Sequence, residues 1–427
     1  MNIQDIHRLF LQCTAIATDT RKIEKNSLFV ALRGENFDAN TFAKQALILG
    51  AKYVLIDDTT YYINEQTILV ENCLETLQEL AKHHRNYLKL PIIALTGSNG
   101  KTTTKELINA ALSQKFNTKA TVGNLNNHIG VPLTLLSFDK NTEIGIVEMG
   151  ANHKKEIDFL CRLATPDFGY ITNFGKAHLE GFGGVEGVIE GKSEMYNYLK
   201  SADKLAFVNL DDQIQVEKTA DIRKYSFGIK KQVADLNINS ITADPLVTIN
   251  VLNKTICTKL IGLYNGSNVS AAIAIATYFK VDFTQIKLAL ELYTSDNNRS
   301  QLLNKGSNKI ILDAYNANPS SMAVAITNFA QLEAVNKVMI LGDMFELGKE
   351  SKHEHQTIVE TAKNFQNISC HFVGTHFYQC KETIDYVHFH HTFEQFEKFV
   401  NENTFSDSTI LIKGSRGMKL ERTLDLI

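Results

Sequence analysis

The feature that most constrains the fold is a glycine-containing turn between an apolar run and a helical pattern. Residues 92–96 read Ile-Ile-Ala-Leu-Thr, and residues 96–104 read Thr-Gly-Ser-Asn-Gly-Lys-Thr-Thr-Thr. From Lys101 onward, apolar residues recur at four-residue spacing, which predicts a helix. A buried strand that leads through a glycine turn into a helix N-terminus is typical of an α/β sheet with an anion-binding edge.

The residue types in this turn are those that a nucleotide triphosphate requires. Gly97 and Gly100 allow close approach of the backbone, Lys101 offers a charge to the outer phosphates, and Thr102 offers a hydroxyl to Mg²⁺. The first glycine of the general phosphate-loop pattern is replaced by Leu95, so this loop is a shorter variant. The alternative is a turn and helix cap without a ligand. Phosphate binding alone would also suit a transporter, a motor, a GTPase or a ligase.

Composition removes several other classes of protein. The 44 Lys and Arg residues nearly balance the 47 Asp and Glu residues, so no global basic field recruits nucleic acid or anionic lipid. No run of about 18 apolar residues predicts a membrane span, and the first residues do not resemble a secretory leader. The six cysteines are dispersed, which favours free thiols over disulfides or a zinc site. We therefore expect a cytoplasmic enzyme, acting as a monomer.

Changes of pattern along the chain divide it into three α/β parts. Residues 1–88 alternate short strands with helices, and residues 89–297 predict a larger, mostly parallel sheet of the phosphate-loop type with flanking helices. Residues 224–262 alternate in a way that suggests an antiparallel appendage. The polar cluster 295–298 is the expected second hinge, and residues 298–427 predict a Rossmann-like domain with strands at 309–313, 337–341 and 409–412.

Two further residues follow strand ends and could face a metal. Glu148 ends the apolar run 144–148, which would bring its carboxylate to the same sheet edge as the glycine turn. His178 follows the strand 168–172 in a glycine-containing loop. An exposed strand-end carboxylate and a structural histidine are the alternatives. The paired His83 and His84 and the group around His390 are expected on the surface.

Several motifs together resemble the Mur ligase family, which forms amide bonds at the expense of ATP in peptidoglycan synthesis. The resemblance spans essentially the whole chain. It comprises the loop 96–104, the acidic strand end Glu148-Met149-Gly150, and Ala177-His178-Leu179-Glu180. Three more stretches resemble the branch that adds D-alanyl-D-alanine. These are 123–132, Asp-Ala-Tyr-Asn-Ala-Asn-Pro at 313–319, and Leu-Gly-Asp-Met-Phe-Glu-Leu-Gly at 341–348.

The resemblance implies an activity and a domain organisation. The expected reaction joins D-alanyl-D-alanine to UDP-N-acetylmuramoyl-tripeptide through an acyl phosphate, with ATP and Mg²⁺. Residues 1–88 would bind the UDP-sugar end, 89–297 would bind ATP, and 298–427 would close over ATP and bind the dipeptide. Another Mur-type or folyl-polyglutamate-type ligase with a different acceptor is the nearest alternative. A nucleotide-switch ATPase without ligation is the alternative from another class.

The resemblance also implies roles for individual residues. Lys101, Lys192, His178 and Arg299 would be catalytic, and Thr102, Glu148, His178 and Lys192, as a carbamate, would hold the metal. ATP would contact Thr96, Gly97, Ser98, Asn99, Gly100, Lys101, Thr102, Thr103, Asn265, Asn268, Arg299 and Asp313. The other substrates would contact Ser27, Asn126, Asn127, Tyr315, Asn316, Asn318, Lys413 and Arg416. Two positions depart from the family pattern: Tyr264 stands where a histidine is common, and Asp38-Ala39-Asn40 replaces Asp-Gly-His.

Overall fold

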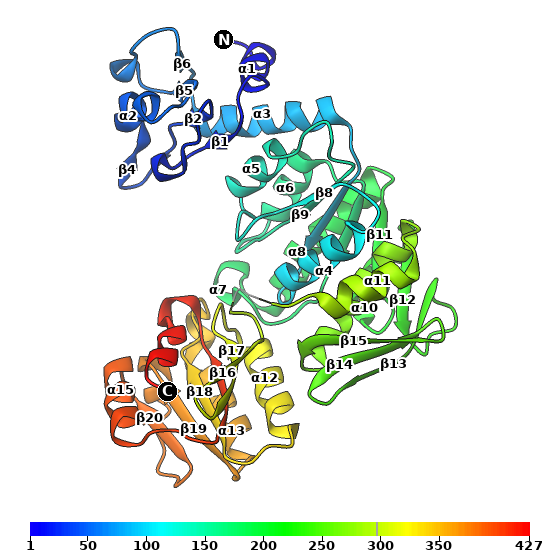
Figure 1. Cartoon of the computed structure of the whole chain (residues 1–427), viewed down its shortest axis with the longest axis vertical. Coiled ribbons are helices and arrows are strands. Elements are labelled where there is room, and N and C mark those ends of the chain that lie inside the picture. Colours follow the sequence, from blue (N-terminus) through cyan, green and yellow to red (C-terminus); the bar gives the residue numbers. More distant parts are fainter. Residues whose placement is uncertain (296–297) are drawn as a thin grey trace.

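A computed structural model describes residues 1–295 and 298–427, arranged as three α/β parts around three main sheets (Figure 1). The expected hinge 295–298 lies partly outside the described residues, because Asp296 and Asn297 are not described. Among the residues that are described, every helix is too short or too polar to cross a lipid bilayer. The three-part α/β fold expected from the sequence is confirmed.

The first part is a small sheet with parallel strands in the order β1-β2-β5-β6, beside a short β3–β4 hairpin. Its long last helix, α3, packs against α5 and α6 and so continues into the second part (Figure 1). The elements are α1 (Ile3–Phe10), β1 (Ile16–Ala17), β2 (Leu28–Val30), β3 (Arg33–Gly34), β4 (Phe37–Asp38), α2 (Ala43–Ile48), β5 (Tyr53–Ile56), β6 (Thr67–Leu69) and α3 (Cys73–Leu88).

The second part has one large sheet in the order β15-β14-β13-β12-β11-β10-β7-β9-β8. Its elements are β7 (Ile92–Thr96), α4 (Lys101–Leu112), β8 (Thr118–Ala120), α5 (Gly130–Leu136), β9 (Ile144–Glu148), α6 (Glu156–Ala164), β10 (Phe168–Ile171), α7 (Leu179–Phe182), α8 (Val185–Ser201), β11 (Leu205–Asn209), α9 (Gln213–Lys218), β12 (Lys224–Ile229), β13 (Leu236–Ala243), β14 (Leu246–Val251), β15 (Lys254–Ile261), α10 (Tyr264–Tyr278) and α11 (Phe283–Leu292).

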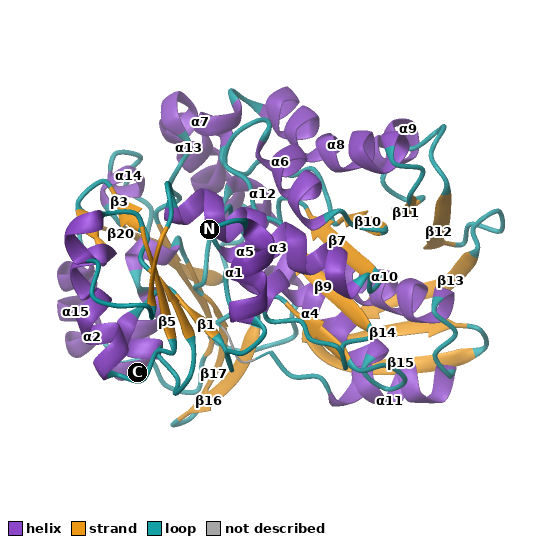
Figure 2. Ribbon diagram, turned by 90° about the horizontal axis from the view of Figure 1, so that it is seen from above, coloured by secondary structure: helices purple, strands orange, loops and turns teal. Residues whose placement is uncertain are grey.

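Alternation along the central strand β7 explains why helices cover both faces of this sheet. Ile92 and Ala94 are fully buried in a core shared with α3, α5, α6 and α8, whereas Ile93 and Leu95 are buried in a core shared with α4, α10 and α11. A strand that is apolar on both faces is expected in a parallel sheet between two helical layers. Figure 2 shows the helices on either side of these strands.

Two sequence expectations were wrong: one concerned residues 224–262 and the other the exposure of the histidines. Residues 224–262 contain the expected antiparallel pairing, between β13 and β14 and between β14 and β15, but they are not an appendage. β12 pairs in parallel with β11 and β13, so these strands extend the same sheet. His84 and His390 are buried rather than on the surface. His84 Nδ1 lies within hydrogen-bond distance, 3.0 Å, of Nε2 of His7, which belongs to α1. Local patterns do not reveal such partners.

The third part is a sheet in the order β16-β17-β21-β18-β19-β20, parallel except for β16. The elements are β16 (Gln301–Lys305), β17 (Asn308–Asp313), α12 (Pro319–Gln331), β18 (Lys337–Gly342), α13 (Ser351–Lys363), β19 (Ile368–Val373), α14 (Thr375–Tyr378), β20 (Val387–His390), α15 (Phe393–Glu402) and β21 (Thr409–Lys413). The carboxyl ends of β17 and β21 and the start of α12 face the second part (Figure 1).

Candidate active site

The glycine turn has positive φ values and close backbone contacts at two positions, which together favour glycine. Gly97 and Gly100 have φ values of +142° and +78°. A Cβ at Gly97 would overlap Thr172 Oγ1, and a Cβ at Gly100 would lie 2.6 Å from Asn268 Oδ1. Thr172 Oγ1 also donates to the carbonyl of Asn99 over 2.6 Å. The loop is therefore held closely against the end of β10 and the start of α10.

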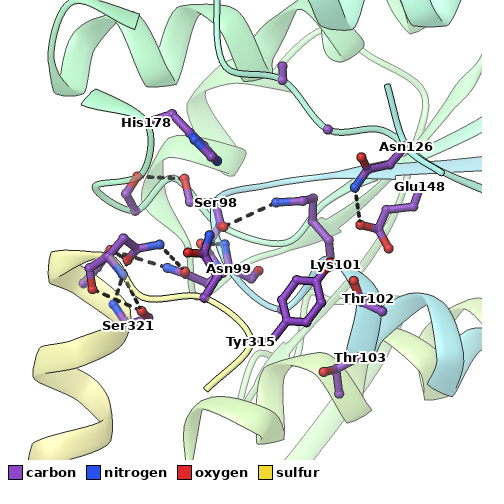
Figure 3. Close-up of a pocket in the computed structure, with 18 of the residues that line it drawn as sticks. Ser98, Asn99, Lys101, Thr102, Thr103, Asn126, Glu148, His178, Tyr315 and Ser321 are labelled. Atoms are coloured by element: carbon purple, nitrogen blue, oxygen red, sulfur yellow. Dashed lines mark hydrogen bonds between the residues drawn. The ribbon is translucent and has the colours of Figure 1, made fainter. Parts of the chain in front are cut away.

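Lys101 begins α4 and folds back over the loop. Its Nζ donates to the Gly97 carbonyl over 2.7 Å and to the Ser98 carbonyl over 3.4 Å, and the second of these bonds is drawn in Figure 3. Burial lowers the pKa of Lys101, and Arg299 lowers it further, while the nearby Glu148 carboxylate opposes both effects. A cation held by its own loop carbonyls is available to phosphate oxygens that enter the loop.

Glu148 ends β9, and among the described residues only one of its two carboxylate oxygens accepts a hydrogen bond. The side chain is 1% exposed, and its Oε1 accepts from Asn126 Nδ2 over 2.8 Å (Figure 3). Within the described part of the chain, Glu148 Oε2 is buried without a hydrogen-bond partner. A buried carboxylate oxygen without a donor is costly unless a cation binds it. Glu148 therefore fits the role of a metal ligand.

Lys192, on α8, is a second buried group without a polar partner. Its side chain is fully buried, and among the described residues its Nζ has no hydrogen-bond partner; it lies 5.1 Å from the centre of the Phe182 ring. Burial lowers the pKa of Lys192 to about 7, and the positive charge of Lys101 adds to the effect. A substantial neutral fraction near neutral pH makes this amine a nucleophile, as carbamate formation with CO₂ requires.

His178 lies on a loop that contacts the third part. It has a positive φ of 53° and precedes α7, and its Nδ1 forms a short hydrogen bond with Glu346 Oε2. This bond lowers the pKa of Glu346. The sequence analysis did not predict this partner, although Glu346 belongs to the motif 341–348.

The third part contributes paired side chains to the same region. Asp313, at the end of β17, accepts from Lys413 Nζ over 2.6 Å and from the Ser300 backbone N–H over 3.1 Å. The guanidinium carbon of Arg299 lies 3.7 Å from the centre of the Tyr315 ring. In the part of the chain that the structure describes, Arg299 Nε is buried without a hydrogen-bond partner.

These groups surround a cavity of about 780 Å³ between the second and third parts. Figure 3 shows the loop side chains, Glu148, His178 and Tyr315 around it. The residues predicted from the sequence that line it are Ser98, Asn99, Gly100, Lys101, Thr102, Thr103, Asn126, Asn127, Glu148, His178, Asn265, Asn268, Arg299, Asp313, Tyr315, Asn316, Asn318 and Lys413.

Five predicted residues do not line this cavity. Thr96 ends β7 and is fully buried, Gly97 follows it, and Lys192 is fully buried on α8. Arg416 is exposed, with its guanidinium carbon 5.5 Å from the Tyr315 ring centre. Ser27 is fully buried in the first part, so its position gives no support to a substrate contact.

Sequence reasoning also missed residues that line the cavity or support the loop. Asn173, two residues after the end of β10, accepts the Asn99 N–H through its side-chain oxygen over 3.1 Å. Asp212 caps α9, and both it and Ser320 line the cavity. These residues follow a strand end or begin a helix, and such positions lie at the sheet edge where ligands bind. This was the sequence feature that could have identified them.

The side chains beside the phosphate loop can be compared with the ligands that Mg²⁺ takes in proteins. Among the described residues, no cluster of three or more His, Cys, Asp and Glu side chains could hold a metal by itself. The free oxygen of Glu148 and the Thr102 hydroxyl are hard ligands beside the loop. Magnesium usually takes one or two carboxylates and completes its shell with phosphate oxygens and water. The residues present fit an ion that arrives with a nucleotide.

Sequence comparison decides the family. The chain is 37% identical over 96% of its length to the UDP-N-acetylmuramoyl-tripeptide–D-alanyl-D-alanine ligase of Bacillus subtilis, and covers 93% of that protein. The chain belongs to the Mur ligase family. Profiles of this family match it as the catalytic domain at residues 12–85, the Mur ligase middle domain at 95–276 and the glutamate ligase domain at 298–416.

Solved Mur ligase structures have the same fold over the whole chain. The MurF crystal structure from Acinetobacter baumannii superposes with a TM-score of 0.87 at 29% identity, covering 100% of this chain and 98% of that one. MurF from Thermotoga maritima, solved in complex with ADP, gives a TM-score of 0.83 at 26% identity, with 98% and 97% covered.

Proposed function

We propose that this Mur ligase joins D-alanyl-D-alanine to UDP-N-acetylmuramoyl-tripeptide, with conversion of ATP to ADP and phosphate. The observation that carries the proposal is the convergence on one cavity of Lys101, Glu148 and the third-domain residues Arg299 and Asp313. The Bacillus subtilis relative is named for this reaction. The use of ATP supports a cytoplasmic location.

The chemical problem is that a carboxylate is a poor electrophile. In the first step, a terminal carboxylate oxygen of the tripeptide attacks the γ-phosphorus of ATP, the bond to the β-phosphate oxygen breaks, and ADP leaves. Lys101, the loop N–H groups and Arg299 stabilise the charge on the transferred phosphoryl group. In the second step, the dipeptide amine attacks the acyl carbon, loses one proton and expels phosphate.

The residues proposed to hold Mg²⁺ are Thr102, Glu148, His178 and Lys192 as its carbamate. When bound, the ion would neutralise charge on the phosphate oxygens. Carbamylation would convert a buried cation into an anion. The side chain of Lys192 would then attract a metal ion rather than repel it. The neutral amine of Lys192 near pH 7 supports this assignment.

Water must be kept from the acyl phosphate, and the two-part cavity offers a way to do so. We propose that residues 1–88 hold the UDP-sugar end, residues 89–297 hold ATP, and residues 298–427 close over both and hold the dipeptide. Ser98, Asn99, Gly100 and Thr103 would cradle the phosphates, and Asn265 and Asn268 would lie near the nucleoside. Asn126, Asn127, Tyr315, Asn316, Asn318, Lys413 and Arg416 would face the other substrates.

An acceptor screen tests the proposal against the alternative ligases. Product formation is measured by mass spectrometry with D-alanyl-D-alanine, meso-diaminopimelate, L-lysine and L-glutamate as acceptors. Product with D-alanyl-D-alanine alone supports the proposal, whereas product with one of the other acceptors identifies a different ligase. ATP hydrolysis without any product would instead indicate a nucleotide-switch ATPase.

A further inference from the structure

The loop at residues 173–178, here called the bridging loop, contacts both the phosphate loop and the third domain. On the phosphate-loop side, the Ser98 N–H donates to the Asn173 carbonyl over 3.1 Å, and Ser98 Oγ donates to the Gly175 carbonyl over 2.7 Å. Asn99 N–H donates to Asn173 Oδ1 over 3.1 Å. The bridging loop therefore fixes the backbone that cradles phosphate.

The other side of the same loop is paired with two carboxylates of the third domain. Lys176 Nζ lies 2.6 Å from Glu354 Oε1, and His178 Nδ1 is hydrogen-bonded to Glu346. Gly175 faces the third domain so closely that a Cβ there would lie 2.6 Å from Ser320 Oγ. A single loop thus joins the third domain to the phosphate cradle.

Glu354 is the more informative of the two carboxylates, because it is buried. Its side chain is 5% exposed, whereas that of Lys176 is 44% exposed. Glu354 lies in the first turn of α13, where the helix dipole favours an acid. Its Oε1 nevertheless bonds across the domain interface to Lys176, rather than to the start of its own helix. A buried carboxylate needs such a partner, so this pair favours the contact between the bridging loop and the third domain.

We propose that Glu354 is a positioning residue for ligation. Through Lys176 it holds the bridging loop, and with it the phosphate loop, in the arrangement that the reaction needs. Glu354 does not line the cavity, so it acts through other residues. The proposal rests on the proposed function, since it concerns the same reaction.

A double-mutant cycle with Lys176→Met and Glu354→Gln tests this role. Because the pair spans a closure interface, each single variant is expected to lower kcat about tenfold while KM for ATP changes less than about threefold. Two residues that act as one unit are not additive, so the double variant is expected to match the single variants. Additive losses, or a kcat equal to that of the wild type, would overturn the proposal.

Glu360→Gln is the matched control, because Glu360 lies on the same helix, is exposed and pairs within that helix with Lys363. Its kcat should equal that of the wild type; an equal loss in this variant would overturn the specific role of Glu354. If Glu354→Gln fails to fold, Lys176→Met alone decides, since Lys176 is half exposed. Absence of ligation in the wild-type protein would instead count against the proposed function, which keeps the two failures distinct.

Discussion

Asn318 Nδ2 donates a hydrogen bond of 2.7 Å to Asn99 Oδ1, which joins the third domain directly to the middle of the phosphate loop. The other end of the same amide caps α12, because Asn318 Oδ1 accepts the Ser321 N–H over 2.9 Å. One side chain therefore starts a helix and binds across the interface. The two roles use different atoms, so a substitution can separate them.

Asn318→Ser should keep the helix cap but lose the bond to Asn99, because serine caps well and is too short to reach the loop. We expect the free energy of unfolding to change by less than about 0.5 kcal/mol, and kcat to fall several-fold. Small-angle scattering should show less compaction with ATP and tripeptide than in the wild type. Equal compaction and equal kcat would contradict a role for this bond in closure.

Lys101→Ala should abolish ATP-dependent phosphate release. The Gly97 carbonyl holds Lys101 Nζ over this loop, so transition-state charge would lose a cation at that position. The loss should be at least about a hundredfold. The control is Lys82→Ala, which removes an exposed lysine on α3. Activity retained in Lys101→Ala would refute the assigned role.

Gly100→Ala should cost both stability and nucleotide binding. Its φ of +78° is unfavourable for alanine, and the added Cβ would press on the Asn268 side chain. Gly306→Ala separates the two causes, since Gly306 has a φ of +59° and open space around it. We expect about 1 kcal/mol of destabilisation at Gly306 from strain alone, and more at Gly100. Equal effects in thermal unfolding would show that the contact with Asn268 is unimportant.

Lys192 should form a carbamate when the protein is supplied with ¹³C-labelled CO₂. The neutral fraction of its amine and the full burial of its side chain favour the product. A carbamate carbon signal is expected in the wild-type spectrum and should be missing from Lys192→Met, which should also lose ligation. A wild-type spectrum without that signal, or an active Lys192→Met, would contradict the assignment.

Acid should destabilise the fold through buried histidines. Burial, reinforced by His84 and His83, lowers the pKa of His7 from 6.5 to about 4. Because the unfolded chain then binds the proton more readily, the free energy of unfolding is unaffected above pH 6.5 and falls as pH drops toward 4, by at most about 3 kcal/mol. Urea unfolding at pH 7 and pH 5 measures this. His7→Gln should reduce the pH dependence; an unchanged dependence would exclude His7 as its source.

Much of this organisation could be predicted from local sequence. The phosphate loop, its strand and its helix follow from glycine, lysine and apolar spacing, and the strand ending in Glu148 follows from a short apolar run. The strands β19 and β20 were not predicted, because histidines interrupt their apolar pattern. The parallel pairing of β12 was missed because alternation in a strand does not specify its neighbour.

The contacts between domains could not be predicted from local sequence. Asn99 and Asn318 are separated by 219 residues, and Lys176 and Glu354 by 178 residues. Each of these side chains has an ordinary local alternative, as a turn residue, a helix cap or a surface charge. Their pairing depends on how the third domain docks, which no periodicity in either segment encodes.

The most direct test of the account follows one oxygen atom. If the tripeptide carboxylate attacks ATP, then UDP-N-acetylmuramoyl-tripeptide labelled with ¹⁸O in its terminal carboxylate must transfer one labelled oxygen to each phosphate released. Mass spectrometry of the phosphate, with ATP, Mg²⁺ and D-alanyl-D-alanine present, should find that single label, and omission of any one component should prevent ligation. Phosphate released without label would contradict an acyl phosphate and, with it, the central claim.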